Sequence, residues 1–276
     1  MKIVFGSVLY KQAMPYFNDF FSSVINQTYK DFDIILMIDD LLPQEISPFI
    51  EKYTNDNCNI KVKYSKKKCR PYELRIYLIE YAKVEGYDLL IIGDCDDVFG
   101  DNRIEKTVEH YQYHQETGFF YNQLYTFDHI PVMGELPYET EYIEQIGERN
   151  YLGLSNTAIN MKYINDSVLS DLKQGNTYIF DWFLYSIFLM RGIKGQYVEE
   201  AMSLYRIHND NLVGIPKPSK DNIQKELAIK IEHYKLLSKY DEYFEKLLIQ
   251  YQELNIKDIK IQVNDKYYWW NFVRLN

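Results

Sequence analysis

The chain has 276 residues, of which 46% are hydrophobic and only 12 are Gly and 8 Pro, so a disordered or linker-rich protein is excluded. Its formal net charge of −9 argues against a nucleic-acid backbone as the main partner. The three cysteines (Cys58, Cys69 and Cys95) have no CxxC spacing and leave one unpaired in any disulfide scheme, which favours a reducing compartment.

Strand and helix patterns alternate through the first hundred residues. In chain order they predict a strand over 2–9, a helix over 15–27, a strand over 32–38, a helix over about 43–54, a strand over 60–64 and a helix over about 71–85. This alternation predicts an α/β fold with a parallel sheet and helices on both faces. Right-handed crossovers then bring the carboxyl ends of the strands to one edge of the sheet.

The next predicted strand carries the strongest functional signal. Its apolar run, 89–92, fits a strand covered on both faces, and Gly93 ends it before Asp94, Asp96 and Asp97. Carboxylates this close repel one another unless a cation or strong donors lie nearby. At the carboxyl edge of a parallel sheet, the natural cation is a hard divalent ion that carries phosphate oxygens.

The acidic turn has two other interpretations. An acidic turn after a strand can simply be solvated. A calcium loop fits at positions 1, 3 and 12 but fails at Val98 and at Phe99, where a glycine should stand. The chain contains neither G-x-G-x-x-G nor G-x-x-x-x-G-K-[ST], so neither a dinucleotide-binding oxidoreductase nor a P-loop enzyme is supported.

The segment SSVINQTYKDFDIILMIDD resembles the opening of a family 2 glycosyltransferase of the GT-A fold, and Asp94, Asp96 and Asp97 match the family's L-D-x-D-D motif. The similarity runs from residue 1 to about 212. It implies a Rossmann-like, mixed and mainly parallel sheet flanked by helices. It also implies an inverting enzyme that uses a nucleotide-sugar.

The resemblance implies roles for the donor-side acids. Asp40, with Asp39 beside it, would contact the uracil of a UDP-sugar, although a helix cap or turn residue is the plain alternative. Asp96 would hold the ribose and Asp97 the metal, Mn²⁺ or Mg²⁺, with Asp94 supporting them from the strand end.

Arg75 occupies the place of a family arginine that reaches the base or diphosphate, although it could equally be a solvated helix residue. The family's P-T-Y-N at the end of the first strand is absent here, where the chain reads Ser7 to Lys11, so no base contact is assigned to that loop.

The second half of the similarity covers the acceptor side. A helix is predicted over 103–116, a strand over 118–127 and a long acceptor-side loop over 129–150. Ser155 and Asn156 lie in a stretch that resembles the family's acceptor-facing segment, where they would offer hydroxyl and amide partners or simply make a turn.

A helix that ends at Gly192 is predicted to begin at Asp181, which the resemblance implies is the general base. A helix N-cap is the structural alternative, and the two roles are compatible. Trp182 follows it and is placed on the acceptor side. The sequence Tyr205 to His208 is similar to the family's Y-R-x-H, which implies that His208 approaches the metal and the leaving diphosphate, whereas a lone histidine is more often structural.

The chain is divided into a catalytic domain (1–215), with a nucleotide-binding half (about 1–100) and an acceptor half (about 101–215), and a C-terminal helical extension (216–276) with two amphipathic helices over 219–254. The aromatic tail KYYWWNFVRLN is assigned to core packing or to oligomerisation, with a membrane or lipid-linked acceptor contact left open.

The sequence therefore predicts an inverting, metal-dependent glycosyltransferase that moves a sugar from a UDP-sugar, or another nucleotide-sugar, to a hydroxyl of a glycan or lipid-linked acceptor. The alternatives are a nucleotidyltransferase and a non-catalytic sugar- or partner-binding domain. No signal peptide is found, and the longest apolar stretch (182–190) is about half of the ~20 residues that a membrane span needs. We expect a cytoplasmic protein without a transmembrane segment, with a homodimer or a contact at the inner membrane face left open.

Overall fold

The computed structural model describes residues 1–53, 59–65, 69–177, 179–207, 219–255 and 268–275. Within them, one nine-stranded sheet has the order β3-β2-β1-β4-β8-β6-β9-β5, with β7 paired to β9. The strands are β1 (Ile3–Tyr10), β2 (Asp33–Asp39), β3 (Asn59–Tyr64), β4 (Leu89–Ile92), β5 (Val98–Phe99), β6 (Phe119–Tyr125), β7 (Glu139–Thr140), β8 (Thr157–Asn160) and β9 (Gly195–Leu204). The α-helices are α1 (Phe17–Ile25), α2 (Pro43–Tyr53), α3 (Pro71–Val84), α4 (Arg103–Tyr113), α5 (Glu144–Gly147), α6 (Asp166–Gly175), α7 (Phe180–Met190), α8 (Lys220–Leu237) and α9 (Glu242–Glu253).

The N-terminal half of the sheet has the parallel arrangement that the sequence predicts. Strands β3, β2, β1 and β4 are parallel neighbours, so their carboxyl ends share one edge. The other half is mixed, because β8 runs antiparallel to β4 and β6, whereas β6 and β9 are parallel. The predicted mixed, mainly parallel sheet flanked by helices is thus confirmed.

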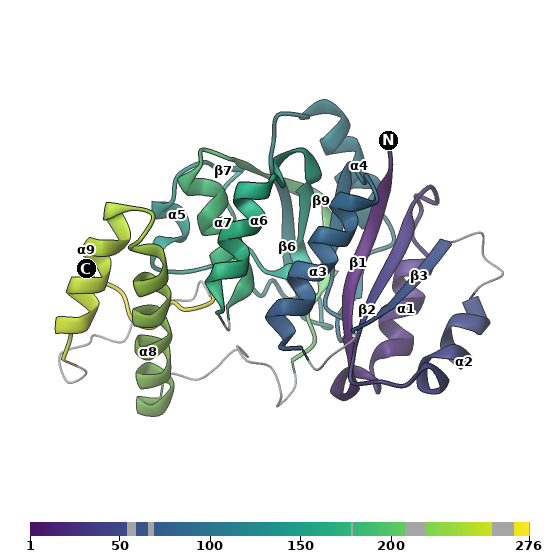
Figure 1. Cartoon of the computed structure of the whole chain (residues 1–276), viewed down its shortest axis with the longest axis horizontal. Coiled ribbons are helices and arrows are strands. Elements are labelled where there is room, and N and C mark those ends of the chain that lie inside the picture. The colour runs from purple at the N-terminus through teal and green to yellow at the C-terminus, as the bar shows by residue number, and fades with distance from the viewer. Residues whose placement is uncertain (54–58, 66–68, 178, 208–218, 256–267, 276) are drawn as a thin grey trace.

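Both faces of the central strands are buried. Val4 and Leu90 belong to the apolar cluster that contains residues of α3, α6 and α7, whereas Phe5 and Ile91 belong to the cluster that contains residues of α1 and α4. This alternation along each strand places the two clusters on opposite faces. In Figure 1, α3 and α6 cross in front of the sheet and α1 lies behind it.

Some elements differ from the sequence prediction. The predicted loop over 129–150 contains β7 and the short helix α5. Helix α6 was not predicted; the Asn165 side chain caps it by accepting the Val168 N–H at 2.9 Å, and Asn176 ends it in a left-handed conformation. Helix α7 begins at Phe180, with Ile179 as N-cap, so Asp181 lies inside the first turn.

The C-terminal helices lie at the end of the molecule opposite α1 and α2 (Figure 1). Buried residues of α8 and α9 join the same apolar cluster as α7. Of the predicted apolar face of α8, Ile223 and Leu227 are buried, but the face also buries Glu226, Lys230 and His233. The predicted domain boundary at 215/216 lies outside the described residues.

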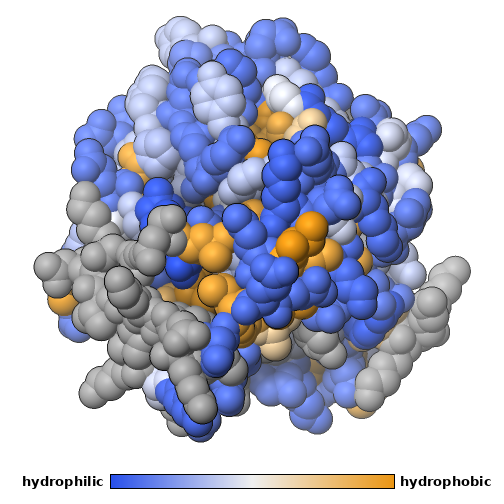
Figure 2. All heavy atoms as spheres, turned by 90° about the vertical axis from the view of Figure 1, so that its left-hand side faces the viewer, coloured by the Kyte–Doolittle hydropathy of each residue, from blue (hydrophilic) through white to orange (hydrophobic). Residues whose placement is uncertain are grey.

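The surface around α8 and α9 is mainly hydrophilic, with smaller apolar areas (Figure 2). The exposed large apolar side chains of the described residues come from many elements, among them Tyr113 of α4, Tyr142 before α5 and Ile249 of α9. Across the described ranges, no helix has both the length and the apolar character that crossing a membrane requires.

Candidate functional site

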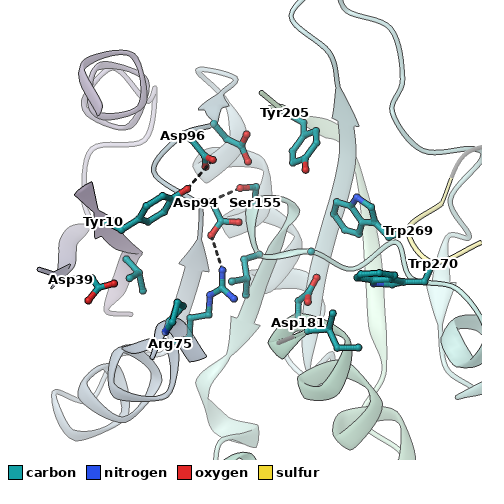
Figure 3. A pocket seen from close by; sticks show the side chains of 16 residues that line it. Tyr10, Asp39, Arg75, Asp94, Asp96, Ser155, Asp181, Tyr205, Trp269 and Trp270 are labelled. Atoms are coloured by element: carbon teal, nitrogen blue, oxygen red, sulfur yellow. Dashed lines mark hydrogen bonds and ion pairs between the residues drawn. The ribbon is translucent and has the colours of Figure 1, made fainter. Parts of the chain in front are cut away.

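A cleft of about 290 Å³ opens where the carboxyl ends of β1, β2 and β4 meet. Figure 3 shows Asp39 and Tyr10 on one side of it and Asp181, Trp269 and Trp270 on the other. Its lining consists of Val8, Tyr10, Asp39, Pro71, Arg75, Asp94, Asp96, Asp97, Gly153, Leu154, Ser155, Ile179, Asp181, Tyr205, Trp269 and Trp270. The cleft thus brings together acids that lie far apart in the sequence.

The acidic turn after β4 is held by hydrogen bonds from several elements. The Asp94 N–H donates to Ser155 Oγ at 2.9 Å, and the Tyr10 hydroxyl donates to the Asp96 carboxylate at 2.9 Å. Asp97 is only 1% exposed, and its Oδ1 accepts the Arg206 N–H at 2.8 Å. Its other oxygen, Oδ2, is buried without a hydrogen-bond partner among the described residues.

Burial and the neighbouring carboxylates destabilise the charged forms of Asp94 and Asp97. Burial raises the pKa of Asp94 to about 6; nearby Asp96 and Asp181 add to the rise, whereas Arg75, 3.5 Å away, opposes it. Burial, together with Asp96 and Asp94, raises the pKa of Asp97 well above its ordinary value. A cation brought to this turn would relieve the repulsion.

The donor set of the turn fits a hard divalent ion. No group of three or more His, Cys, Asp or Glu side chains is gathered as a metal site within the described ranges. Mg²⁺ is usually held by one or two protein carboxylates, and its other ligands are water and substrate phosphates. The unpartnered Oδ2 of Asp97, with Asp96 beside it, supplies that kind of site. His208, the other predicted metal residue, lies outside the described residues.

Two arginines hold the acidic turn and the strand ends next to it by hydrogen bonds to backbone carbonyls. Arg103 is buried and donates to the carbonyls of Ile92 (2.7 Å) and Thr157 (3.2 Å), which join the ends of β4 and β8. Burial lowers its pKa to about 9, and the charge of Asp97 opposes that change. The Arg206 guanidinium donates to the Asp96 carbonyl at 2.8 Å, which fixes the turn against the end of β9.

Asp181 lies across the cleft from the acidic turn (Figure 3). Burial raises its pKa, whereas Arg75 and the first backbone amides of α7 lower it. The Asn150 side-chain amide donates to its carboxylate at 3.4 Å. Asp181 is therefore a carboxylate of increased basicity that faces the cleft, next to the tryptophan pair.

Three predicted residues do not line the cleft. Asp40 is exposed, with a φ of 53°, and Asp39 takes the place at the cleft instead. Asn156 is buried and donates to the carbonyls of Asn122 and Tyr151. Trp182 is also buried, because it points into the core, where its indole N–H donates to the Ile146 carbonyl at 2.6 Å. The structure therefore places Trp182 in the core and not at the cleft.

The four aromatic residues of the cleft were not predicted as site residues: Tyr10, Tyr205, Trp269 and Trp270. Tyr10 ends β1 at the same edge as Asp39, so the rule for parallel strands was sufficient to find it. The tryptophans come from the C-terminal tail, where no periodicity indicates their position.

Comparison with known proteins identifies the family. The family model described as "Glycosyl transferase family 2" matches residues 9–166, more than half of the chain. The chain belongs to this family. It is therefore a glycosyltransferase, which leaves the nucleotidyltransferase and the non-catalytic domain without support. No curated protein sequence matches the chain.

Solved structures of other glycosyltransferases share the fold. TarS 1–349 from S. aureus, in complex with UDP, has a TM-score of 0.58 at 12% identity and covers 91% of this chain and 71% of its own. The mannosyltransferase PcManGT from Pyrobaculum calidifontis, with GDP-Man and Mn²⁺, has a TM-score of 0.58 at 8% identity, covering 91% and 68%. GalNAc-T7 with UDP, GalNAc and Mn²⁺ has a TM-score of 0.58 at 14% identity, covering 94% and 52%. At these identities the likeness shows a common fold for this family 2 member.

Proposed function

We propose that this family 2 glycosyltransferase transfers a sugar from a UDP-sugar to a hydroxyl of a glycan or lipid-linked acceptor with inversion at the anomeric carbon. The observation that carries the proposal is that Asp181 and the acidic turn line one cleft, on opposite sides of it (Figure 3). Inversion requires the attacking oxygen and the leaving diphosphate to lie on opposite faces of the sugar. A base and an anion site that face each other meet this requirement.

The donor lies along the edge formed by β1, β2 and β4. Asp39 contacts the uracil of the UDP-sugar, Asp96 binds the ribose, and Arg75 lies near the diphosphate. Asp97 and Asp96 would hold Mn²⁺ or Mg²⁺, which offsets charge on the leaving diphosphate when it is bound. The complexes of similar fold that contain UDP or Mn²⁺ support this choice of donor and cofactor.

Asp181 takes the proton of the acceptor hydroxyl onto its carboxylate as the acceptor oxygen bonds to the anomeric carbon. The bond between that carbon and the phosphate oxygen breaks, and UDP leaves. The raised pKa of Asp181 strengthens it as a base, whereas Arg75 and the amides of α7 favour its ionised form. The Asn150 amide orients the carboxylate.

Asp181→Asn tests this assignment, because it preserves the shape of the side chain and removes its basicity. We expect the transfer rate to fall by about 10²–10⁴-fold. UDP affinity in the presence of Mn²⁺, measured by calorimetry, should stay nearly unchanged, since the proposal gives Asp181 a contact with the acceptor and none with UDP.

Asp166→Asn is the matched control, because Asp166 lies in the first turn of α6 and its side chain is exposed to solvent. Asp166→Asn should change neither the transfer rate nor the UDP affinity. Transfer by Asp181→Asn at the wild-type rate would refute the base assignment, and an absence of metal-linked UDP binding in the wild-type protein would refute the proposed function.

A further inference from the structure

Two tryptophans of the C-terminal tail, Trp269 and Trp270, line the cleft beside Asp181 and across from Asp39 and Tyr10 (Figure 3). They are 7% and 8% exposed. Since both line the cleft, part of that exposed surface faces the substrate space. They lie on the side of Asp181 away from the proposed donor edge, which is where an acceptor has to enter.

The Trp269 ring is held in place by its neighbours. Its backbone pairs with Asn150 through two hydrogen bonds of 2.8 and 3.0 Å, and the Asn150 side chain in turn reaches Asp181. The ring lies against Gly153, where an added Cβ would be 2.3 Å from the ring. Asn150 thus links the position of Trp269 to the proposed base.

The Trp270 ring packs in a row of buried aromatic rings. It lies parallel to the buried Trp182 ring, at 6.4 Å and 8°, and Trp182 stacks in turn on His233 of α8 at 4.3 Å. The backbone of Trp270 has a φ of 60°, a left-handed conformation that is unfavourable for a bulky residue. Such a conformation persists when the surrounding structure enforces it, and it occurs preferentially at functional sites.

A buried charge pair on α8 holds the rest of the tail. Lys230 lies 3.4 Å from Glu226 and donates to the carbonyls of Val273 and of Glu148, the latter at 2.6 Å. Glu226 accepts the Val273 N–H at 2.8 Å, and Glu148 accepts the Leu275 N–H at 2.8 Å. The tail is therefore anchored on both sides of its backbone and is a fixed part of the cleft wall.

This wall has the chemistry of a sugar-binding surface. An indole presents a flat, electron-rich face that suits the C–H groups on one face of a pyranose, while the hydroxyls at the ring edge need polar partners. Asp181 supplies an acceptor for one of those hydroxyls. The combination of a planar apolar wall and an adjoining carboxylate fits a sugar ring and not a lipid chain, which would cover the carboxylate without offering it a hydrogen bond.

We propose that Trp269 and Trp270 form the acceptor subsite, on which a pyranose ring stacks with one hydroxyl directed at Asp181. This inference rests on the proposed function, because it takes the acceptor to be a sugar. Asn150, Lys230 and Glu226 are positioning residues, since they act through the tail and through Asp181.

The test uses the full chain saturated with UDP and Mn²⁺, and methyl glycosides of glucose, galactose, mannose and N-acetylglucosamine as probes. Saturation-transfer NMR should show transfer to the C–H protons of one ring face of at least one glycoside. Trp270→Leu keeps an apolar side chain but removes the flat face, and should weaken glycoside binding by about tenfold. Trp270→Phe restores a flat ring and should recover part of the affinity.

Calorimetry with UDP and Mn²⁺ is the parallel measurement that separates the two proposals. Unchanged UDP affinity in both variants, together with about tenfold weaker glycoside binding in Trp270→Leu, supports the subsite. Glycoside binding that is absent in the wild-type protein or unaffected in Trp270→Leu overturns the subsite, whereas the proposed function stands if UDP binds. A wild-type protein that does not bind UDP overturns the proposed function itself.

Discussion

Replacing Asp97 by Asn should stabilise the metal-free protein and at the same time remove its metal-linked UDP binding. Asp97 is 1% exposed, and its Oδ2 has no hydrogen-bond partner in the described part of the chain. Asparagine keeps the size of the side chain and the oxygen that accepts the Arg206 N–H, but it removes a buried charge next to Asp96 and Asp94. The same change removes a proposed metal ligand.

The size of the gain follows from these contacts. Each unit by which burial and the neighbouring carboxylates raise the pKa of Asp97 costs the folded protein about 1.4 kcal/mol at a pH where the side chain is ionised. Relief of that cost should raise the free energy of unfolding of the metal-free protein by a similar amount. For a chain of this size, each 1 kcal/mol raises the Tm by roughly 2–4 °C.

The gain should also increase with pH. The pKa of Asp97 is raised above its ordinary value of 3.8, so between 3.8 and the raised value the folded protein binds a proton that the unfolded chain has lost. The wild-type free energy of unfolding therefore falls as pH rises through this window, by at most about 1.4 kcal/mol per unit. The Asn variant lacks this loss, so its advantage over wild type should be smallest near pH 4.

Thermal unfolding in a chelator between pH 4.5 and 7.5, repeated with Mn²⁺ and UDP, measures both effects. At a ligand concentration of 100 Kd, wild type should gain about 2.7 kcal/mol and the variant almost nothing. Asp101→Asn, at an exposed position shortly after the turn, is the control and should behave as wild type. A variant that is less stable than wild type at every pH and is still stabilised by UDP with Mn²⁺ would refute the reasoning.

Two further predictions concern the tail and the wall that it forms. Lys230→Met should lower the free energy of unfolding by about 3–5 kcal/mol in urea titrations, because Glu226 stays buried without its cation. Adding Glu226→Gln should recover most of this loss. A double variant that recovers none of it would exclude the charge pair as the cause. Burial lowers the pKa of Lys230 to about 8, so between pH 8 and the ordinary lysine value of 10.5 the unfolded chain binds more protons than the folded protein. Lys230 should therefore raise the free energy of unfolding of the wild-type protein as pH rises through this range. Lys230→Met should lack this rise. Gly153→Ala should displace the Trp269 ring and raise the acceptor KM while UDP affinity stays constant; an unchanged KM would show that the ring position does not matter for the acceptor.

The first half of the fold could be predicted because its signals are local. Each strand from β1 to β4 is a short apolar run, and each is separated from the next by an amphipathic helix, so the order and direction of the strands followed from general rules. The same rules placed Asp39 and the acidic turn at one edge. Their shared cleft agrees with the prediction, although their roles in binding remain proposals.

The acceptor side was harder to predict because it depends on contacts between distant segments. Trp182 and Trp270 are both aromatic residues near the site, and only the packing of α7 decides that the first points into the core and the second toward the cleft. Likewise, nothing in the local pattern of α8 indicates that Glu226 and Lys230 face inward, because they compensate each other only in the folded chain.

The hydrogen bonds of the acidic turn have a consequence for how the enzyme can be divided. Asp94 is anchored by Ser155, and Asp97 is anchored by Arg206, which follows the last strand of the sheet. A fragment that ended near residue 100 would keep all three carboxylates but lose both anchors and the charge of Arg103. The proposed donor site therefore depends on the complete sheet, and isolating residues 1–100 should leave the three carboxylates without the contacts that position them.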